Sequence, residues 1–185
     1  MVAARPVALV GLSGTGKSTV APLLATLLGC RPVDLDRAVE EDHGCTVGEL
    51  FERGEDVFRD AEARALTDTL AGGPSVIATG GGVVLRASNR RALASADVVW
   101  LRAPVAVLVE RLAGHAQRRP LLDGDPAAAL SVLASEREPL YREVADVVVD
   151  VDGLDPAAVA AEVARRLDPS SSHGVSAGHG GCPGG

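Results

Sequence analysis

A glycine-rich stretch, GLSGTGKS at residues 11–18, constrains the fold of this chain more than any other feature. It matches the pattern GxxxxGKS/T in full, in which backbone N–H groups surround a phosphate and the lysine reaches the outer phosphates of a nucleotide. The apolar run Pro6–Val10 before it predicts a strand buried on both faces. Apolar residues at helical spacing over Ser18–Leu28 predict a helix that ends at Gly29. A strand, a glycine turn and a helix in this order predict an α/β domain with a phosphate-binding loop.

Further strands and helices alternate along the chain. Short apolar runs predict strands at Arg31–Leu35, Val76–Ala78, Asp97–Leu101 and Val144–Val149. Helical patterns are found at Glu55–Leu70, Asn89–Ala94, Pro104–Leu112, Pro126–Tyr141 and Pro156–Leu167. Pro139 is expected to end or kink the fourth of these helices. Alternating strands and helices predict three layers, with a mostly parallel five-stranded sheet and helices on both of its faces.

Two segments are expected to lie outside the regular part of a single domain at residues 1–168. Residues 114–125 are polar, basic and rich in turn-forming residues, which predicts a mobile loop. Residues 169–185 are mostly Ser, Gly, His and Pro, and they bury too little apolar surface to offset the entropy of ordering. We therefore expect a disordered tail; a metal-binding tract formed by its histidines and Cys182 is the alternative.

Charge and cysteine content exclude several classes of partner. The net charge of −7 disfavours nucleic acid, because the field of the protein would repel phosphates. Three cysteines, far apart and without metal-ligand spacing, favour a reducing compartment. The N-terminal apolar stretch is too short to span a membrane. Heptad repeats are not evident. The expectation is a cytoplasmic protein with no membrane partner, acting as a monomer.

The basic residues carry a sharper signal, because only one of the 18 is a lysine, and it is Lys17 of the glycine-rich stretch. Lysine is a compact point charge, whereas arginine is a wide planar fork. A chain that uses arginine everywhere else has therefore kept lysine where a compact cation is needed. A chance survivor on a solvated surface is the alternative. We expect Lys17 to be an exposed loop residue whose removal costs little stability.

The loop predicts one half of a phosphotransfer site. Lys17 reaches the β- and γ-phosphates of ATP, and the hydroxyl of Ser18 binds Mg²⁺. The N-terminus of the following helix directs its positive end to the same place. The residues expected to contact the nucleotide here are Gly14, Thr15, Gly16, Lys17, Ser18 and Thr19.

Two acidic residues and a run of glycines mark the other half. Asp34 and Asp36 follow the second predicted strand, where open α/β sheets place their ligands. If the strand continues, both carboxylates project from one face into the cleft; helix-capping or turn residues are the alternative. Residues 80–82 are three consecutive glycines, which predict a close approach of backbone to ligand, with a plain flexible turn as the alternative.

Arginines are scattered along the rest of the chain. Arg59 lies on the long predicted helix, Arg119 in the polar loop, and Arg137 on a later helix. Each alone is most simply a surface charge. An acidic protein that binds anions needs such groups to converge, because arginine binds carboxylate or phosphate through two parallel hydrogen bonds.

Taken together, these pieces resemble the shikimate kinase family over residues 5–167. The matching motifs occur in the order GLSGTGKST, DLD, VGELF with FRDAE, TGGG, RPLL and REPLY. The resemblance implies a three-layer P-loop kinase fold and ATP-dependent phosphorylation of the 3-hydroxyl of shikimate in aromatic amino-acid biosynthesis. Its partners would be shikimate and ATP, with Mg²⁺ as cofactor.

The resemblance also implies roles on the acceptor side. Arg59 and Arg137 would clamp the carboxylate of shikimate, and Asp36 would accept hydrogen bonds from its hydroxyls. The backbone at Gly81 and Gly82 would complete this set.

On the donor side, Asp34 would support Mg²⁺ through water. The loop at residues 114–125 would be a mobile lid, from which Arg119 closes over the phosphates. Arg111 would contact adenine, beside Val151, which stands where the family often has threonine. Glu62 would hold the side chain of Arg59 in place. Lys17, Asp36 and Arg119 are thus the expected catalytic residues.

Two alternatives stay open. One is a kinase for an amino-substituted shikimate analogue or another polyol acid. The other is a sensor that binds ATP without an acceptor, which Asp36, Arg59 and Arg137 together disfavour, because a sensor needs none of them.

Overall fold

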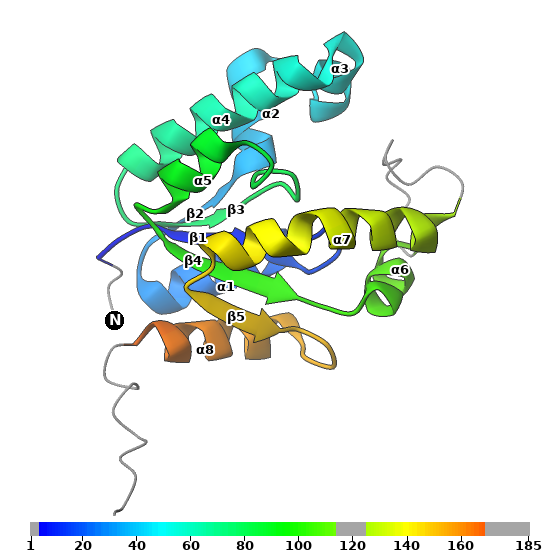
Figure 1. Ribbon diagram of the computed structural model, residues 1–185. Coiled ribbons are helices and arrows are strands. Elements are labelled where there is room, and N and C mark those ends of the chain that lie inside the picture. The colour runs from blue at the N-terminus through cyan, green and yellow to red at the C-terminus, as the bar shows by residue number, and fades with distance from the viewer. Residues whose placement is uncertain (1–3, 114–124, 169–185) are drawn as a thin grey trace, which may run out of the picture.

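The computed structural model describes residues 4–113 and 125–168, which form a three-layer α/β domain around one parallel sheet (Figure 1). The five strands are β1 (Val7–Val10), β2 (Arg31–Asp34), β3 (Ser75–Ala78), β4 (Asp97–Arg102) and β5 (Val147–Asp150). They lie in the order β2-β3-β1-β4-β5, and every pairing is parallel. Val7 is in register with Val76 on one side and with Asp97 on the other. The predicted sheet is confirmed.

The described helices are α1 (Lys17–Leu28), α2 (Leu35–His43), α3 (Val47–Arg53), α4 (Glu55–Ala71), α5 (Ala87–Leu93), α6 (Val105–Ala113), α7 (Pro126–Val144) and α8 (Pro156–Leu167). Helices α1 and α8 pack together on one side of the sheet, whereas α5 and α7 cover the other (Figure 1). Helices α2, α3 and α4 lie together beyond the edge of the sheet that β2 forms (Figure 1). No helix in the described part of the chain is long and apolar enough to cross a membrane.

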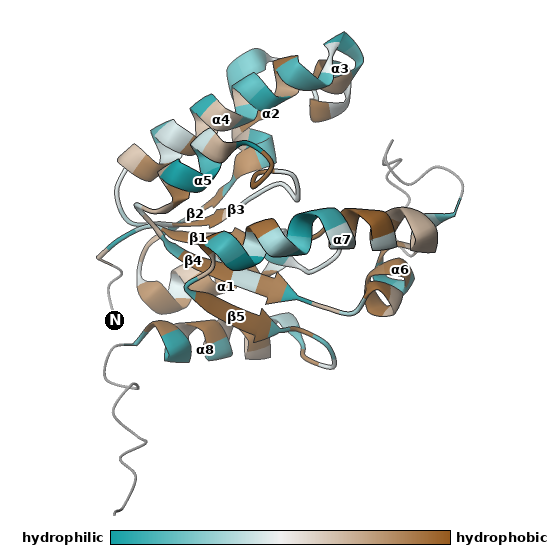
Figure 2. Ribbon diagram, in the orientation of Figure 1, coloured by the Kyte–Doolittle hydropathy of each residue, from teal (hydrophilic) through white to brown (hydrophobic). Residues whose placement is uncertain are grey.

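Aliphatic side chains build the main core, because only 2% of the residues are aromatic. Every residue of β1 is buried, with Ala8 and Leu9 wholly inaccessible, and Figure 2 shows the apolar strands at the centre of the molecule. A second, smaller cluster joins α2, α3 and α4 through four buried side chains, Val39, Leu50, Phe58 and Ala61. Burying a side chain such as Leu50 contributes roughly 1.5–3 kcal/mol. This cluster supports the helix that carries Arg59.

Helices α2 and α3 were not predicted, and the second strand ends one residue earlier than expected. The side chain of Asp34 caps α2 by accepting a hydrogen bond from the backbone N–H of Arg37 at 3.3 Å. Thr46 and Glu49 form a capping box at the start of α3. These local hydrogen bonds satisfy N–H groups that a helix start leaves open, so both helices begin where the caps lie.

Helix α7 continues through Pro139 to Val144, so the expectation that this proline ends the helix near Tyr141 is wrong. Tyr141 is fully buried beyond the proline, and its packing offsets the lost backbone hydrogen bond. The predicted lid and tail lie outside the described residues, except for Asp125. Its carboxylate caps α7 by accepting hydrogen bonds from two backbone N–H groups, at 3.0 and 3.2 Å.

Candidate active site

The glycine-rich loop between β1 and α1 adopts a backbone that needs glycine at three positions. Gly11, Gly14 and Gly16 have φ values of 141°, 86° and 89°, in the region that L side chains rarely adopt. A Cβ on Gly11 would also collide with the carbonyl oxygen of Leu101. Gly16 is the N-cap of α1 and no side chain caps this end, so the N-terminal dipole of α1 is left to act on a ligand.

Lys17 lies inside the loop rather than on its surface. Its side chain is only 8% exposed, and Nζ donates hydrogen bonds to the carbonyl oxygens of Gly11 at 2.7 Å and Leu12 at 2.8 Å. The hydroxyl of Thr15 donates to the same Leu12 oxygen at 2.9 Å. The expectation of an exposed lysine is therefore wrong, because the loop encloses the ammonium group with its own carbonyl groups.

A cleft of about 600 Å³ runs along this loop. One end is formed by Arg111, which donates hydrogen bonds to the carbonyl oxygens of Gly14 at 3.5 Å and Val151 at 2.9 Å. The other end reaches Asp36 and the glycines after β3. Of the predicted site residues, the cleft is lined by Gly14, Thr15, Gly16, Lys17, Ser18, Thr19, Asp36, Gly81 and Arg111.

The two acidic residues of the DLD motif do not share a strand face, so that expectation is wrong. Strand β2 ends at Asp34, and Asp36 lies in the first turn of α2. Successive helical residues rotate by about 100°, which separates side chains two positions apart. Asp36 lines the main cleft, whereas Asp34 lines a neighbouring cavity of about 500 Å³ together with Ser18. The capping alternative describes Asp34 correctly.

The three glycines after β3 provide space rather than unusual dihedral angles. None of residues 80–82 has a positive φ. A Cβ on Gly80 would lie 3.0 Å from Oε1 of Glu62 and 3.1 Å from Oδ1 of Asp36. The loop is thus closely packed by carboxylates from α2 and α4, and a larger residue would displace them.

Two arginines approach the same loop. A Cβ on Gly81 would lie 3.5 Å from Nη1 of Arg137, and one on Gly82 would overlap the guanidinium of Arg59. Arg59 and Arg137 are 6% and 8% exposed and come from α4 and α7. The fold therefore brings together, at one glycine loop, three of the residues predicted from distant motifs.

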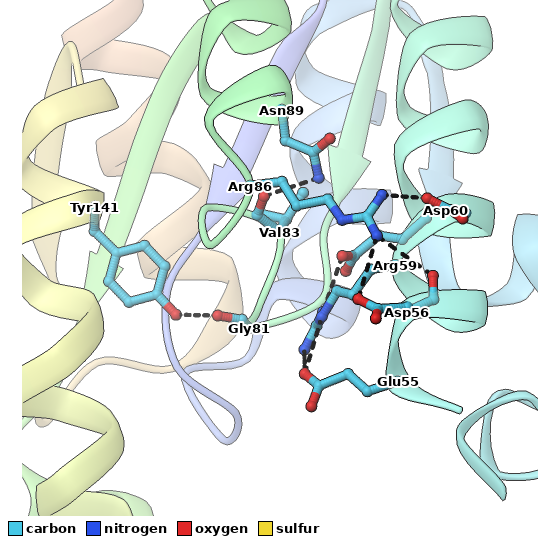
Figure 3. A network of polar contacts seen from close by, with 10 residues as sticks. Glu55, Asp56, Arg59, Asp60, Gly81, Val83, Arg86, Asn89 and Tyr141 are labelled. Carbon is cyan, nitrogen blue, oxygen red and sulfur yellow. Dashed lines mark hydrogen bonds and ion pairs between the residues drawn. The ribbon is translucent and has the colours of Figure 1, made fainter. Parts of the chain in front are cut away.

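The guanidinium of Arg59 is held from several sides (Figure 3). Nη1 donates to Glu62 at 2.9 Å, while Nε and Nη2 donate to Oε1 of Glu55 at 3.3 and 3.2 Å. The rings of Phe51 and Phe58 stack on each other, and the guanidinium carbon lies 5.6 and 5.1 Å from their centres. Glu55 was not predicted; its i,i+4 spacing from Arg59 was the available signal.

Two buried polar atoms near this loop have no hydrogen-bond partner among the described residues. They are Oε1 of Glu62 and Nε of Arg137. An acceptor and a donor left open beside a cleft are the groups that a polar ligand or an ordered water satisfies. Burial raises the pKa of Glu62, and the nearby Arg59 opposes that rise. Burial thus outweighs the ion pair with Arg59 in setting the direction of this pKa shift.

Replacing Glu62 by glutamine is expected to change how stability depends on pH. Because the pKa of Glu62 is raised above its ordinary value of 4.5, the folded protein holds this proton more tightly than the unfolded chain. Its contribution to stability is fully present below pH 4.5 and is lost as pH rises through the folded pKa. The melting temperature of Glu62→Gln, measured relative to that of the unsubstituted protein, should therefore rise as the pH is raised from 4.5 to 8.

The matched control is Glu52→Gln, at an exposed glutamate of α3. A plot of its melting temperature against pH should run parallel to that of the unsubstituted protein. Differential scanning calorimetry across this pH range measures both. If the plot of melting temperature against pH for Glu62→Gln also ran parallel to that of the unsubstituted protein, the prediction would be contradicted.

Replacing Gly82 by alanine is expected to displace Arg59. The new Cβ would overlap a guanidinium that Glu55 and Glu62 hold in place. We expect the KM of the acceptor to rise by about tenfold or more, with the KM of the nucleotide within about twofold. Steady-state kinetics with each substrate varied in turn measures the split. In the control Gly48→Ala, the new Cβ meets nothing closer than 3.8 Å, so an equal effect there would refute the contact argument.

The remaining predicted residues are the arginine expected to close over the phosphates and the two residues expected to bind Mg²⁺. Arg119 lies outside the described residues. Ser18 and Asp34 share a cavity and supply the hydroxyl and carboxylate oxygens that Mg²⁺ accepts. In the described ranges, no group of three or more His, Cys, Asp or Glu side chains is placed to hold a metal ion. This donor set fits an ion coordinated mainly by phosphate oxygens and water.

Comparison with known proteins gives a consistent result. A family model described as shikimate kinase matches residues 13–168. A shikimate kinase from Symbiobacterium thermophilum is 44% identical over 172 residues, covering 91% of this chain and 99% of the relative. One from Gloeobacter violaceus is 49% identical over 161 residues, covering 86% and 90%. The solved shikimate kinase from Acinetobacter baumannii in complex with shikimate has a TM-score of 0.84 at 35% identity, covering 88% and 92%.

Proposed function

The chain belongs to the shikimate kinase family, and we propose that its cleft transfers the γ-phosphoryl group of ATP to the 3-hydroxyl of shikimate, yielding shikimate 3-phosphate and ADP. The observation that carries this proposal is the meeting of Asp36, Arg59 and Arg137 at the glycine loop beside Lys17. Arginines bind a carboxylate through paired hydrogen bonds and an aspartate accepts hydrogen bonds from hydroxyls, so this combination suits a carboxylic acid with ring hydroxyls.

On the acceptor side, Arg59 and Arg137 bind the carboxylate, and the backbone of Gly81 and Gly82 contacts the ring. Both guanidinium groups are largely buried, so their attraction for an anion is screened little by water. Asp36 accepts a hydrogen bond from a ring hydroxyl at the end of the cleft. These assignments rest on the positions of the side chains and on the family motifs.

On the donor side, the loop from Gly14 to Thr19 encloses the phosphates, with the N-terminus of α1 directed at them. Lys17 exchanges its carbonyl partners for the β- and γ-phosphates. Arg111 and Val151 lie at the adenine end of the cleft. Arg119 closes over the phosphates, as its family motif implies.

Magnesium is the proposed cofactor, held by Ser18 and supported by Asp34 through water. When bound, it neutralises charge on the phosphate oxygens. The protein itself contributes mainly positioning and a preorganised electrostatic environment, because phosphoryl transfer asks for little covalent chemistry. Asp36 orients the attacking hydroxyl and accepts its proton late in the reaction. We also propose that the enzyme acts as a monomer in the cytoplasm.

A panel of acceptors tests the proposal. ADP release is measured with purified enzyme, ATP and Mg²⁺ for shikimate, an amino-substituted shikimate, quinate, gluconate and no acceptor. We expect the highest kcat/KM with shikimate and very slow release without an acceptor. A higher kcat/KM with another acid would assign the site to that substrate, and ADP release independent of any acceptor would indicate a nucleotide hydrolase or sensor.

A further inference from the structure

The hydroxyl of Tyr141 lies between α7 and the glycine loop, beside both Gly81 and Arg137. The Tyr141 side chain is fully buried, and its hydroxyl donates to the carbonyl oxygen of Gly81 at 2.5 Å (Figure 3). The ring of Trp100 packs against it, with ring centres 5.8 Å apart. A phenol fixed on one side by packing and on the other by a hydrogen bond holds the Gly81 carbonyl at a defined position.

Gly81 is the point at which the two halves of the active site touch. A Cβ on this residue would lie 3.5 Å from the carbonyl oxygen of Gly11 and 3.5 Å from the backbone nitrogen of Ser13, both in the phosphate-binding loop. It would lie equally close to Nη1 of Arg137. A shift of the Gly81 peptide therefore changes the spacing between the acceptor loop, Arg137 and the phosphate-binding loop together.

Tyr141 and Arg137 are four residues apart on α7, so they project from the same face of the helix. The hydrogen bond from the hydroxyl of Tyr141 thus fixes the distance between the glycine loop and α7, the helix that carries Arg137. Burial raises the pKa of Tyr141, which keeps its hydroxyl protonated and able to donate throughout the pH range in which the enzyme is assayed. The hydrogen bond is accordingly a constant feature of the site.

From this geometry we propose that Tyr141 is a positioning residue for the acceptor, and that its hydrogen bond to Gly81 sets the distance between the glycine loop, Arg137 and the phosphate-binding loop. The proposal rests on the proposed function, since it concerns binding of shikimate at the same site. Tyr141 contacts neither substrate; it acts through the backbone that does.

The same loop has a second anchor that supplies a matched control. Asn89 of α5 is 2% exposed, and its Nδ2 donates to the carbonyl oxygen of Val83 at 3.0 Å (Figure 3). Like Tyr141, it is a buried side chain with one hydrogen bond to a loop carbonyl. Val83 follows the glycines, on the side of the loop that faces α5. Loss of this bond loosens the loop without removing the contact at Gly81.

The test compares Tyr141→Phe with Asn89→Ala in the full-length enzyme. Phenylalanine keeps the ring and its packing and removes only the hydroxyl. We expect the KM of shikimate to rise by about five- to tenfold in Tyr141→Phe, with the KM of ATP within about twofold and the pH profile unchanged. Both variants should melt about 2–6 °C lower, because each leaves a buried carbonyl without its donor. Asn89→Ala should keep the KM of shikimate within about twofold.

Calorimetric titration of shikimate into each variant without ATP measures the same change as a Kd. An unchanged Kd and KM for shikimate in Tyr141→Phe would overturn the proposal, as would equal losses for shikimate and ATP, which indicate a general structural role. A similar rise in the Kd and KM of shikimate in Asn89→Ala would overturn it too, because any loosening of the loop would then weaken shikimate binding. If the unsubstituted enzyme phosphorylates shikimate, these failures concern Tyr141 alone; if it neither binds nor phosphorylates shikimate, the proposed function fails and this proposal with it.

Discussion

Replacing Lys17 by alanine is expected to lower kcat by about three orders of magnitude, because it removes the cation that we propose neutralises charge developing on the transferred phosphoryl group. The effect should not be rescued by Lys17→Arg. Arginine is the cation that this chain uses at its other 17 basic positions. Its planar fork is too wide for a loop that encloses the ammonium group at 2.7 and 2.8 Å. Steady-state assays at saturating ATP and shikimate measure both variants.

Lys17→Ala should also destabilise the protein, in contrast to the small effect that the sequence alone predicts. The buried carbonyl group of Gly11 loses the hydrogen bond from Lys17, and that of Leu12 keeps only its hydrogen bonds from Thr15, which together costs about 1–3 kcal/mol of unfolding free energy. Chemical denaturation measures this loss. An Ala variant that kept more than a tenth of the normal kcat would contradict a catalytic role, and the lysine would then serve only to hold the loop together.

Replacing Asp36 by asparagine is expected to lower kcat by about a hundredfold or more, with the fold unchanged. The amide keeps the size of the side chain but can neither accept a proton from the 3-hydroxyl nor orient it as strongly. Asp36 lines the cleft next to Gly80, where we propose that the acceptor binds. We therefore expect the variant to slow phosphoryl transfer and to leave nucleotide binding unchanged. Turnover assays and the KM of ATP separate these two effects.

Asp34→Asn is the matched control for Asp36→Asn. Asparagine caps helices as well as aspartate does, so α2 should keep its start. The proposed contact of Asp34 is with Mg²⁺, and we expect this variant to need a higher Mg²⁺ concentration for half-maximal rate while keeping the KM of shikimate. Near-normal turnover in Asp36→Asn would remove Asp36 from the mechanism, and identical kinetic defects in the two variants would refute the separation of their roles.

Local sequence signals predicted the elements that depend on neighbouring residues. The apolar run before Gly11, the glycines of the loop and the helical spacing after Lys17 each occur within a few residues, and the strand, turn and helix they predict are present. Helix α3 was missed, although the Thr46–Glu49 capping box could have found it. Pro139 misled for the opposite reason. Helix α7 continues past it to Val144, where buried Tyr141 packs against Trp100, a residue from a distant part of the sequence.

The residue types of the site and their order were thus determined by the sequence: a lone lysine in a phosphate-binding loop, two aspartates, three glycines and separate arginines. Only the tertiary structure decided how they meet. It placed Asp34 and Asp36 in different cavities, enclosed Lys17, and packed Arg59 and Arg137 against neighbouring glycines. The physical reason is that motifs reflect local geometry and chemistry. The distance between two motifs depends instead on how helices pack over the sheet, which contacts between residues far apart in the chain determine.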